Sequence, residues 1–229
     1  MTRLLGAPQA HAGEECELAD VLKVNPQSPE AICLDYALQL INAGKVISIP
    51  TDTFYGLAAD PFDLYAVEEI FQIKGRPAHK PLLLLVSSVE QAEELSTGDL
   101  PDRFYALTRR FWPGPLTVVI PASRRVPLKI TGNTGKVAVR LPNASVPVSL
   151  TKALDGPLTG TSANLAGMKE CSSAQQVELC MGQRLPLILD GGESAIPVPS
   201  TIVEVSREGW RLIRDGAIPA EQIANFFAT

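Results

Sequence analysis

A strongly basic side chain ends an apolar segment of the chain. Arg140 directly follows Val137, Ala138 and Val139, a pattern typical of a buried strand. An unpaired guanidinium is costly to bury, so Arg140 needs an anionic partner. That partner is either a carboxylate of the protein or an anionic substrate, and the residues leave both alternatives open.

Other polar side chains also follow predicted elements. Lys74, Arg76 and Lys80 lie within seven residues at the end of a predicted helix, where positive charge alone could complement the helix dipole. Hydroxyl, amide and guanidinium groups follow several predicted strands, namely Thr53, Ser162, Asn164, Ser200 and Arg214. Open α/β sheets bind ligands where their strands end. Together these side chains predict a site for a polyphosphate.

Several common kinds of site are excluded. Gly132–Lys136 imitates a phosphate-binding loop, but Ile130 and Val137 stand where that loop needs Gly and a hydroxyl residue. No G-x-G is present, so the dinucleotide fingerprint is missing. The two histidines and four cysteines include no C-x-x-C pair, which disfavours a zinc site or a Ser-His-Asp triad. The chemistry must therefore rely on positioning and charge.

Length and composition set the class of protein. The 229 residues are 45% hydrophobic and 20% charged, which is typical of a globular protein. The net charge of −5 disfavours a general nucleic-acid binder. The most apolar run, Leu82–Val86, is far shorter than the roughly 20 residues that span a bilayer. No signal-peptide core is visible either, so we expect a cytoplasmic protein without membrane contact.

The polar groups must be positioned by alternating helices and strands. Ser28 is predicted to cap a first helix that Gly44 ends, and Ser173 with Gln176 is predicted to form a capping box. Further helices are predicted over 64–74, 101–112, 146–154 and 219–227, and strands over 46–49, 82–86, 116–120, 136–141, 158–161, 187–190, 201–205 and 210–214. Residues 1–27 lack periodicity and are predicted to be a mobile, dispensable arm. Residues 28–229 are predicted to form one α/β domain around a mixed sheet.

Six motifs occur in an order that resembles one known family. They are I-S-I-P-T-D-T-F-Y-G-L-A with K-G-R-P-x-x-K-P-L in 47–86, F-W-P-G-P-L-T-V-V at 111–119, V-A-V-R-L-P at 137–142, T-S-A-N-L-A-G at 161–167, P-S-T-I-V at 199–203 and L-I-R-D-G-A-I at 212–218. Over about residues 30–220 the chain closely resembles the YrdC family of threonylcarbamoyl-AMP synthases. The resemblance implies a twisted, open mixed β-sheet with flanking helices and a large, positively lined concave cavity.

The resemblance also implies an activity. Members of this family are nucleotidyltransferases that convert L-threonine, bicarbonate and ATP into L-threonylcarbamoyladenylate and pyrophosphate. Partner proteins then transfer the threonylcarbamoyl group to tRNA. We accordingly expect Mg²⁺ to accompany ATP, no organic cofactor, no dedicated metal site, and at most weak contact with tRNA.

Residue roles follow from the same resemblance. It implies that L-threonine is bound by Thr53, Arg140, Ser162 and Ser200. It implies that ATP is contacted by Arg76, Lys80, Lys136, Asn164, Ser172 and Arg214. It implies catalytic roles for Lys74, Arg76 and Arg140, with Lys74 adding positive charge beside the phosphates.

The chain departs from the family pattern in two places. Leu85 stands where some members carry a histidine near threonine, and Ala166 replaces a common serine. Only 15 residues follow Arg214, so the chain resembles the short family form. Two alternatives compete with the synthase: a non-catalytic YrdC-type domain that binds RNA, and a carbamoyl-transferring relative. The acidic composition disfavours the first, and the absence of acylphosphatase-like and zinc-finger segments disfavours the second.

Overall fold

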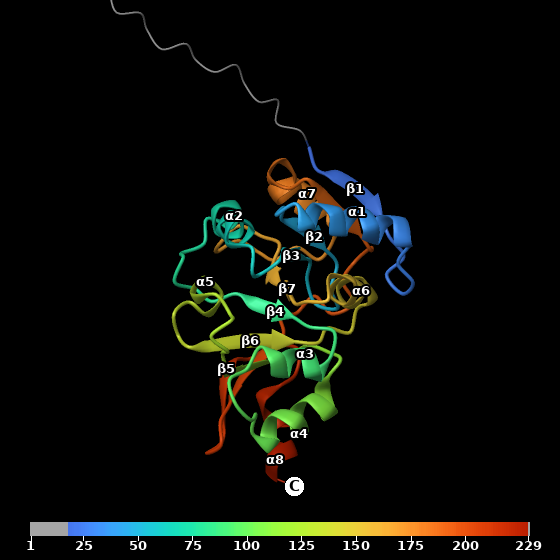
Figure 1. The fold of residues 1–229 in the computed structure, drawn as a ribbon. Coiled ribbons are helices and arrows are strands. Elements are labelled where there is room, and N and C mark those ends of the chain that lie inside the picture. Colours follow the sequence, from blue (N-terminus) through green and yellow to red (C-terminus); the bar gives the residue numbers. More distant parts are fainter. Residues whose placement is uncertain (1–17, 229) are drawn as a thin grey trace, which may run out of the picture.

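The computed structural model describes residues 18–228, which form a mixed α/β fold with strands in two sheets (Figure 1). The first sheet has the order β1 (Asp20–Lys23), β9 (Leu187–Asp190), β2 (Ile47–Ile49), β3 (Gly56–Ala58) and β8 (Thr161–Ser162). The second has the order β11 (Trp210–Arg214), β10 (Thr201–Val205), β5 (Leu116–Pro121), β6 (Lys136–Arg140), β4 (Leu83–Leu85) and β7 (Leu158–Thr159). The predicted α/β class is therefore confirmed, with two mixed sheets where one was expected.

Helices flank both sheets. They are α1 (Ala31–Asn42), α2 (Leu64–Lys74), α3 (Val89–Glu94), α4 (Asp102–Phe111), α5 (Leu128–Thr131), α6 (Ser145–Leu154), α7 (Ala174–Met181) and α8 (Ala220–Ala228), with a 3₁₀ turn at Gly182–Arg184. Figure 1 shows α1 and α7 beside β1 at one end of the molecule, and α4 and α8 at the other. Within residues 18–228, no helix is both long and apolar enough to cross a membrane.

Local signals explain why α2 begins and ends as predicted. The Asp63 carboxylate accepts hydrogen bonds from the amides of Tyr65 and Ala66, which otherwise lack partners in the first turn. Gly75 ends the helix in the left-handed region, at φ 58°. Between these caps, Val67 and Ile70 are fully buried at helical spacing. Lys74 is the last residue of this helix, and Arg76 follows directly after its Gly75 cap.

The first helix begins later than predicted. Ser28 does not cap it, because the Ser28 amide donates to the Asn25 side chain at 3.0 Å within a preceding turn. Helix α1 starts at Ala31, and Glu30 occupies the N-cap position without a side-chain cap bond. The Glu30 carboxylate instead accepts from the Asn25 amide at 2.9 Å. Ser28 thus belongs to the turn at Asn25 and does not cap the helix.

The prediction of a mobile arm over residues 1–27 is wrong for residues 20–23. Residues Asp20–Lys23 form β1, which pairs in parallel with β9 at the edge of the first sheet. The strand is short and mostly exposed, so its sequence carries no clear alternation, and the pairing with β9 stabilises it. Val24 follows it into the core, at 5% exposure. Residues 1–17 lie outside the described part of the chain.

The predicted strand over 158–161 divides between the two sheets. β7 pairs with β4 in the second sheet, and β8 pairs with β3 in the first. Gly160 lies between them, where an added Cβ would come within 2.6 Å of the Leu85 side chain. The chain can therefore cross from one sheet to the other here because residue 160 has no side chain. This crossing positions Ser162.

The central strands of the second sheet place the polar residues that follow them. Leu84, Val118, Val139 and Val203 are fully buried, and each contributes about 1.5–3 kcal/mol of transfer free energy. β4 and β6 run in parallel, with Leu85 opposite Arg140. The predicted hairpin of β10 and β11 is confirmed as an antiparallel pair. It brings Arg214 opposite Ile202, near the start of β10.

Candidate functional site

A cavity of about 280 Å³ lies where the two sheets meet. It is lined by the guanidinium-bearing residues Arg76, Arg140 and Arg214 and by the hydroxyl residues Thr53, Ser162 and Ser200. Apolar lining comes from Leu83, Leu85, Val119, Ala138 and Ile202. Six predicted site residues, which are far apart in the sequence, thus line one cavity. The expectation of a large cavity stays a prediction.

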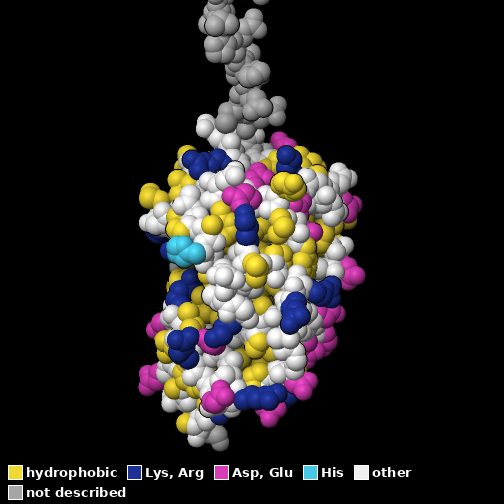
Figure 2. Space-filling view, turned by 60° about the vertical axis from the view of Figure 1, so that its left-hand side comes forward, with side chains coloured by type: hydrophobic (Ala, Val, Ile, Leu, Met, Phe, Trp, Pro, Cys, Tyr) yellow, Lys and Arg dark blue, Asp and Glu magenta, His cyan; other side chains and the backbone are white. Residues whose placement is uncertain are grey.

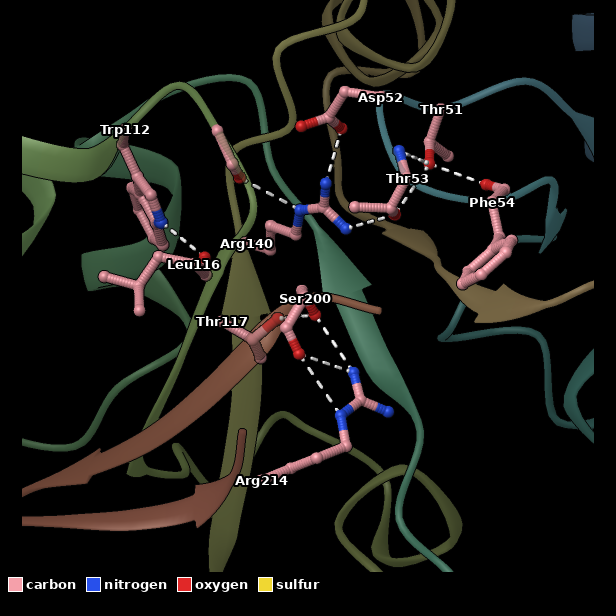
Figure 3. Close-up of polar contacts among 11 residues, drawn as sticks. Thr51, Asp52, Thr53, Phe54, Trp112, Leu116, Thr117, Arg140, Ser200 and Arg214 are labelled. Carbon is pink, nitrogen blue, oxygen red and sulfur yellow. Dashed lines mark hydrogen bonds and ion pairs between the residues drawn. The ribbon is translucent and has the colours of Figure 1, made fainter. Parts of the chain in front are cut away.

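Arg140 is held by three protein acceptors (Figure 3). Its Nε donates to the Gly114 carbonyl at 3.0 Å, one terminal nitrogen donates to Thr53 Oγ1 at 2.9 Å, and the other donates to Asp52 Oδ1 at 2.5 Å. The side chain is buried, and a protein carboxylate is its ion-pair partner. Of the two alternatives for the partner of Arg140, the protein carboxylate is therefore present. The residue also lines the cavity, so the substrate-binding role stays a prediction.

The turn that carries Asp52 is itself fixed by hydrogen bonds. Thr51 Oγ1 accepts from the Thr53 amide at 3.1 Å and donates to the Phe54 carbonyl at 2.6 Å. Both threonines and Asp52 are buried. No role was predicted for Asp52, although an acidic residue that follows a buried strand is an available partner for Arg140. The turn therefore supplies Arg140 with both a charged and a neutral acceptor.

Ser200 and Arg214 form the opposite side of the cavity (Figure 3). Arg214 donates from Nε and from a terminal nitrogen to the Ser200 carbonyl, at 3.2 and 2.8 Å, and also to Ser200 Oγ at 3.1 Å. Ser200 Oγ lies 2.8 Å from the hydroxyl of buried Thr117. Burial, together with the charge of Arg140, lowers the pKa of Arg214. The guanidiniums thus disfavour one another until an anion binds between them.

Arg76 is positioned mainly by backbone. One terminal nitrogen donates to the Pro81 carbonyl at 3.0 Å. Its Nε is buried and has no hydrogen-bond partner among the described residues. Burial lowers the pKa of this guanidinium. A buried donor without a partner on the edge of a cavity is well suited to an anionic ligand.

Lys74 is not among the residues that line the cavity, and its role beside the phosphates stays a prediction. Its ammonium donates to the carbonyl of Ser162, to the carbonyl of Asn164 at 2.8 Å and to Asn164 Oδ1 at 3.2 Å. The residue is 2% exposed. Burial, and then the charge of Arg76, lowers the pKa of Lys74 to about 8. Lys74 therefore fixes the turn that presents Ser162.

Asn164 is also used inside the protein. Its Oδ1 accepts from Ser162 Oγ at 2.6 Å as well as from Lys74. Its amide nitrogen donates to the carbonyls of Leu165 at 3.0 Å and Met168 at 2.7 Å. Asn164 is buried and does not line the cavity. Of this motif, Thr161 and Ser162 line the cavity.

The other predicted ATP contacts lie outside the cavity. Lys136 pairs with Glu204 and lines a separate cavity near Pro121 and Val205. It begins β6, whereas Arg140 ends that strand, and four residues of strand separate their Cα atoms by about 13 Å. Lys80 is exposed on the loop after α2. Ser172 lies 3.4 Å from the Gln176 side chain at the start of α7.

Two further lining residues were given no binding role from the sequence. Glu170 is the one carboxylate among the described residues that line the cavity, and it favours the charged form of Arg214. Leu85 lines the cavity at the position of the family histidine and packs against Gly160. Glu170 carries no sequence signal of its own, whereas Leu85 was noted only as a departure from the family pattern. Each is found only because β4 and the 161–170 segment meet in space.

A larger cavity of about 480 Å³ borders the other side of the Asp52 turn. Its described lining residues include the acidic Asp52 and Glu193 but no Lys, Arg or His. An acidic lining without cations disfavours a polyphosphate. The smaller cavity with three guanidiniums is therefore the better candidate site.

Comparison with known proteins identifies sequence relatives. A family model of the Sua5/YciO/YrdC domain, described as "Telomere recombination", matches residues 39–216. A Pyrococcus abyssi protein named threonylcarbamoyl-AMP synthase is 40% identical over 82% of this chain and 55% of its own length. A Marinobacter nauticus protein of the same name is 36% identical over 78% of this chain and 94% of its own. The chain thus spans about half of the first relative and nearly all of the second.

The fold also has a solved counterpart. The crystal structure of P. abyssi Sua5 complexed with L-threonine superposes with a TM-score of 0.86 and 37% sequence identity, covering 91% of this chain and 61% of that one. The residues matched by the family model include all the residues that line the cavity. They confirm the resemblance found from the six motifs. This chain belongs to the Sua5/YciO/YrdC family.

Proposed function

We propose that this chain is an L-threonylcarbamoyladenylate synthase, a nucleotidyltransferase that uses L-threonine, bicarbonate and ATP. The observation that carries the proposal is the gathering of three guanidiniums and several hydroxyl residues, among them Thr53, Ser162 and Ser200, around one cavity. The names of the relatives and the L-threonine in the P. abyssi structure support the same activity.

The residues suit a reaction between two anions. The amine of L-threonine and bicarbonate form a carbamate with loss of water. A carbamate oxygen then attacks the α-phosphorus of ATP in line, and the bond to the leaving pyrophosphate breaks. Because attacking group and ATP are both negative, the protein must position them and neutralise charge. No nucleophilic side chain is needed for this step.

The cavity suggests how the two substrates are arranged. Arg140, Thr53 and Ser200 would receive the carboxylate of L-threonine, since a planar guanidinium fits a carboxylate well. Arg76 and Arg214 would face the phosphates. Arg76 has an unpartnered buried Nε among the described residues, which makes it the better prepared of the two. Ser162 would add a hydroxyl beside L-threonine.

Magnesium would be held mainly by ATP. No group of three or more His, Cys, Asp or Glu side chains that could hold a metal occurs among residues 18–228. Glu170 is the carboxylate that lines the described cavity. Phosphate oxygens and water are common Mg²⁺ ligands, and such an arrangement fits these residues. The bound ion would neutralise charge on the phosphates.

The adenylate would be passed to partner proteins that modify tRNA. The opposing hypothesis, a non-catalytic RNA-binding domain, requires a basic surface. The chain carries a net charge of −5, and Lys and Arg side chains alternate with Asp and Glu over the face drawn in Figure 2. We therefore place any contact with tRNA second to catalysis, and we propose a cytoplasmic location for the reaction.

One assay tests the activity directly. The protein is incubated with ATP, Mg²⁺, L-threonine and labelled bicarbonate, and pyrophosphate release and a labelled adenylate are measured. We expect both products only when L-threonine and bicarbonate are present together. Equal pyrophosphate release with either one omitted would contradict the proposal. Tight binding of tRNA without any adenylate would favour the RNA-binding alternative.

A further inference from the structure

The carboxylate of Asp52 lies behind Arg140, away from the candidate cavity. Asp52 is 6% exposed and borders the larger neighbouring cavity, whereas Arg140 lines the candidate cavity. Its Oδ1 accepts from Arg140, while its Oδ2 is buried and has no hydrogen-bond partner among the described residues. A buried carboxylate with one unpartnered oxygen is costly. Within residues 18–228, Arg140 is its ion-pair partner.

Arg140 is held at three points that come from separate segments. Gly114 belongs to the loop before β5, and Thr53 and Asp52 belong to the turn after β2 (Figure 3). Two of these acceptors are neutral, and the Asp52 carboxylate is the charged one. All three bonds have a cationic donor, and the bond to Asp52 also has an anionic acceptor, which makes it the strongest of the three. Asp52 is therefore the contact that most firmly sets the plane of the guanidinium.

The three protein contacts leave part of the guanidinium free. Arginine has five N–H donors, and three are used by Gly114, Thr53 and Asp52. The remaining two can serve a planar anion in the cavity. A guanidinium that could swing between acceptors would offer those donors in no fixed direction. Ordering it beforehand lowers the cost of binding.

We propose that Asp52 is a positioning residue that orients Arg140 toward the carboxylate of L-threonine. The proposal rests on the proposed function, because it takes L-threonine as the ligand of Arg140. Asp52 acts through Arg140 and does not itself touch the substrate, since it does not line the candidate cavity. It also partly balances the charge of a cavity that holds Arg76 and Arg214 as well. Selectivity for a carboxylate should then depend on Asp52.

The test compares two ligands that differ in one group. L-Threoninamide matches L-threonine except that an amide replaces the carboxylate. We expect wild-type protein to bind L-threonine more tightly in calorimetry, and Asp52→Asn to reduce this preference by about tenfold, the size of effect that outer partners have at metal-ligand sites. The KM for ATP should stay unchanged. Glu204→Gln, which removes a carboxylate paired with Lys136 outside the cavity, is the matched control.

A second variant keeps the test informative if Asp52→Asn does not fold. Asp52→Glu retains the charge but shifts the guanidinium by one methylene, so it should fold and still lose preference for L-threonine. A wild-type preference in folded Asp52→Asn and Asp52→Glu, with only the melting temperature lowered, would show a purely structural role and overturn the proposal. Wild-type protein that binds both ligands equally would overturn the proposed function, and this proposal with it.

Discussion

At the scale of single residues, the site is built from buried polar groups that serve one another first. Arg140, Lys74 and Asn164 were all expected to serve the substrates, and each also makes hydrogen bonds to protein partners. Arg140 differs from the other two because it also lines the cavity. A buried polar residue type predicts that a partner exists, but it does not predict whether that partner is a protein group or a substrate. The fold decides between the two.

Removing Arg140 should destabilise the fold. Arg140→Ala leaves the Asp52 carboxylate buried and unpaired, which costs about 3–5 kcal/mol in free energy of unfolding. Urea unfolding followed by tryptophan fluorescence measures this loss. The double variant Arg140→Ala with Asp52→Asn removes the unpaired charge and should recover part of the stability. Equal stability of wild type and Arg140→Ala would contradict the ion pair seen here.

Lys74 should give stability a pH dependence. The pKa of its ammonium falls from 10.5 to about 8 on folding, because of burial. Between about pH 8 and 10.5 the unfolded chain therefore binds more protons than the folded one, and the contribution of Lys74 to the free energy of unfolding rises with pH. The difference between wild type and Lys74→Met should increase across this range in denaturant titrations.

The exposed Lys152→Met variant is the control for loss of a lysine charge. A wild-type minus Lys74→Met difference that stays flat, or falls, from pH 8 to 10.5 would disprove the lowered pKa. The positioning role of Lys74 has its own readout. Lys74→Met should raise the KM for L-threonine by more than the loss of apoprotein stability explains, because Ser162 is no longer held.

At the scale of elements, sequence signals succeed where both ends of an element are local. Helix α2 has its Asp63 cap and its Gly75 end in the sequence, and its bounds match the prediction. β1 and the division of 158–162 into β7 and β8 depend on partners far along the chain. Short strands of two to four residues carry too little periodicity to be found alone. The polar groups were therefore predicted better than the sheets that arrange them.

Truncation at Ser28 should destabilise the protein, contrary to the expectation that residues 1–27 are dispensable. It removes β1 and the buried side chain of Val24, worth about 1.5–3 kcal/mol. It also removes the Asp20 carboxylate that accepts from the Tyr36 hydroxyl at 3.0 Å. A chain of this size should lose about 2–4 °C in melting temperature per kcal/mol.

The chain that begins at Leu18 is the matched reference, because it keeps β1. Its melting temperature should exceed that of the chain beginning at Ser28. The effect should also reach the site, since β9 leads into Gly191 and Gly192, which bond the hydroxyl of the cavity residue Tyr55. Identical melting curves for the two truncated chains would refute a stabilising role of β1.

At the scale of the whole molecule, an acidic chain concentrates cations in one cavity. The net charge is −5, yet Arg76, Arg140 and Arg214 line a space of about 280 Å³. They come from the loop after α2, from β6 and from β11, so only the folded chain brings them together. The charge of Arg140 lowers the pKa of Arg214, and an anion bound between them would relieve this repulsion. Composition alone could not predict this local excess.

Binding of pyrophosphate should therefore raise the melting temperature. Loss of a cation that lines the cavity should reduce this shift, whereas loss of a cation outside the cavity should not. A ligand at 100 times its Kd stabilises the fold by about 2.7 kcal/mol. Arg214→Gln removes a lining guanidinium and should reduce the shift. Lys136→Gln removes a cation that pairs with Glu204 outside the cavity, and it should leave the shift unchanged. Thermal melts of the three proteins across a pyrophosphate series measure the effect. If Lys136→Gln lost as much of the shift as Arg214→Gln, the polyphosphate would extend beyond the cavity. The site would then include the start of β6, where Lys136 lies.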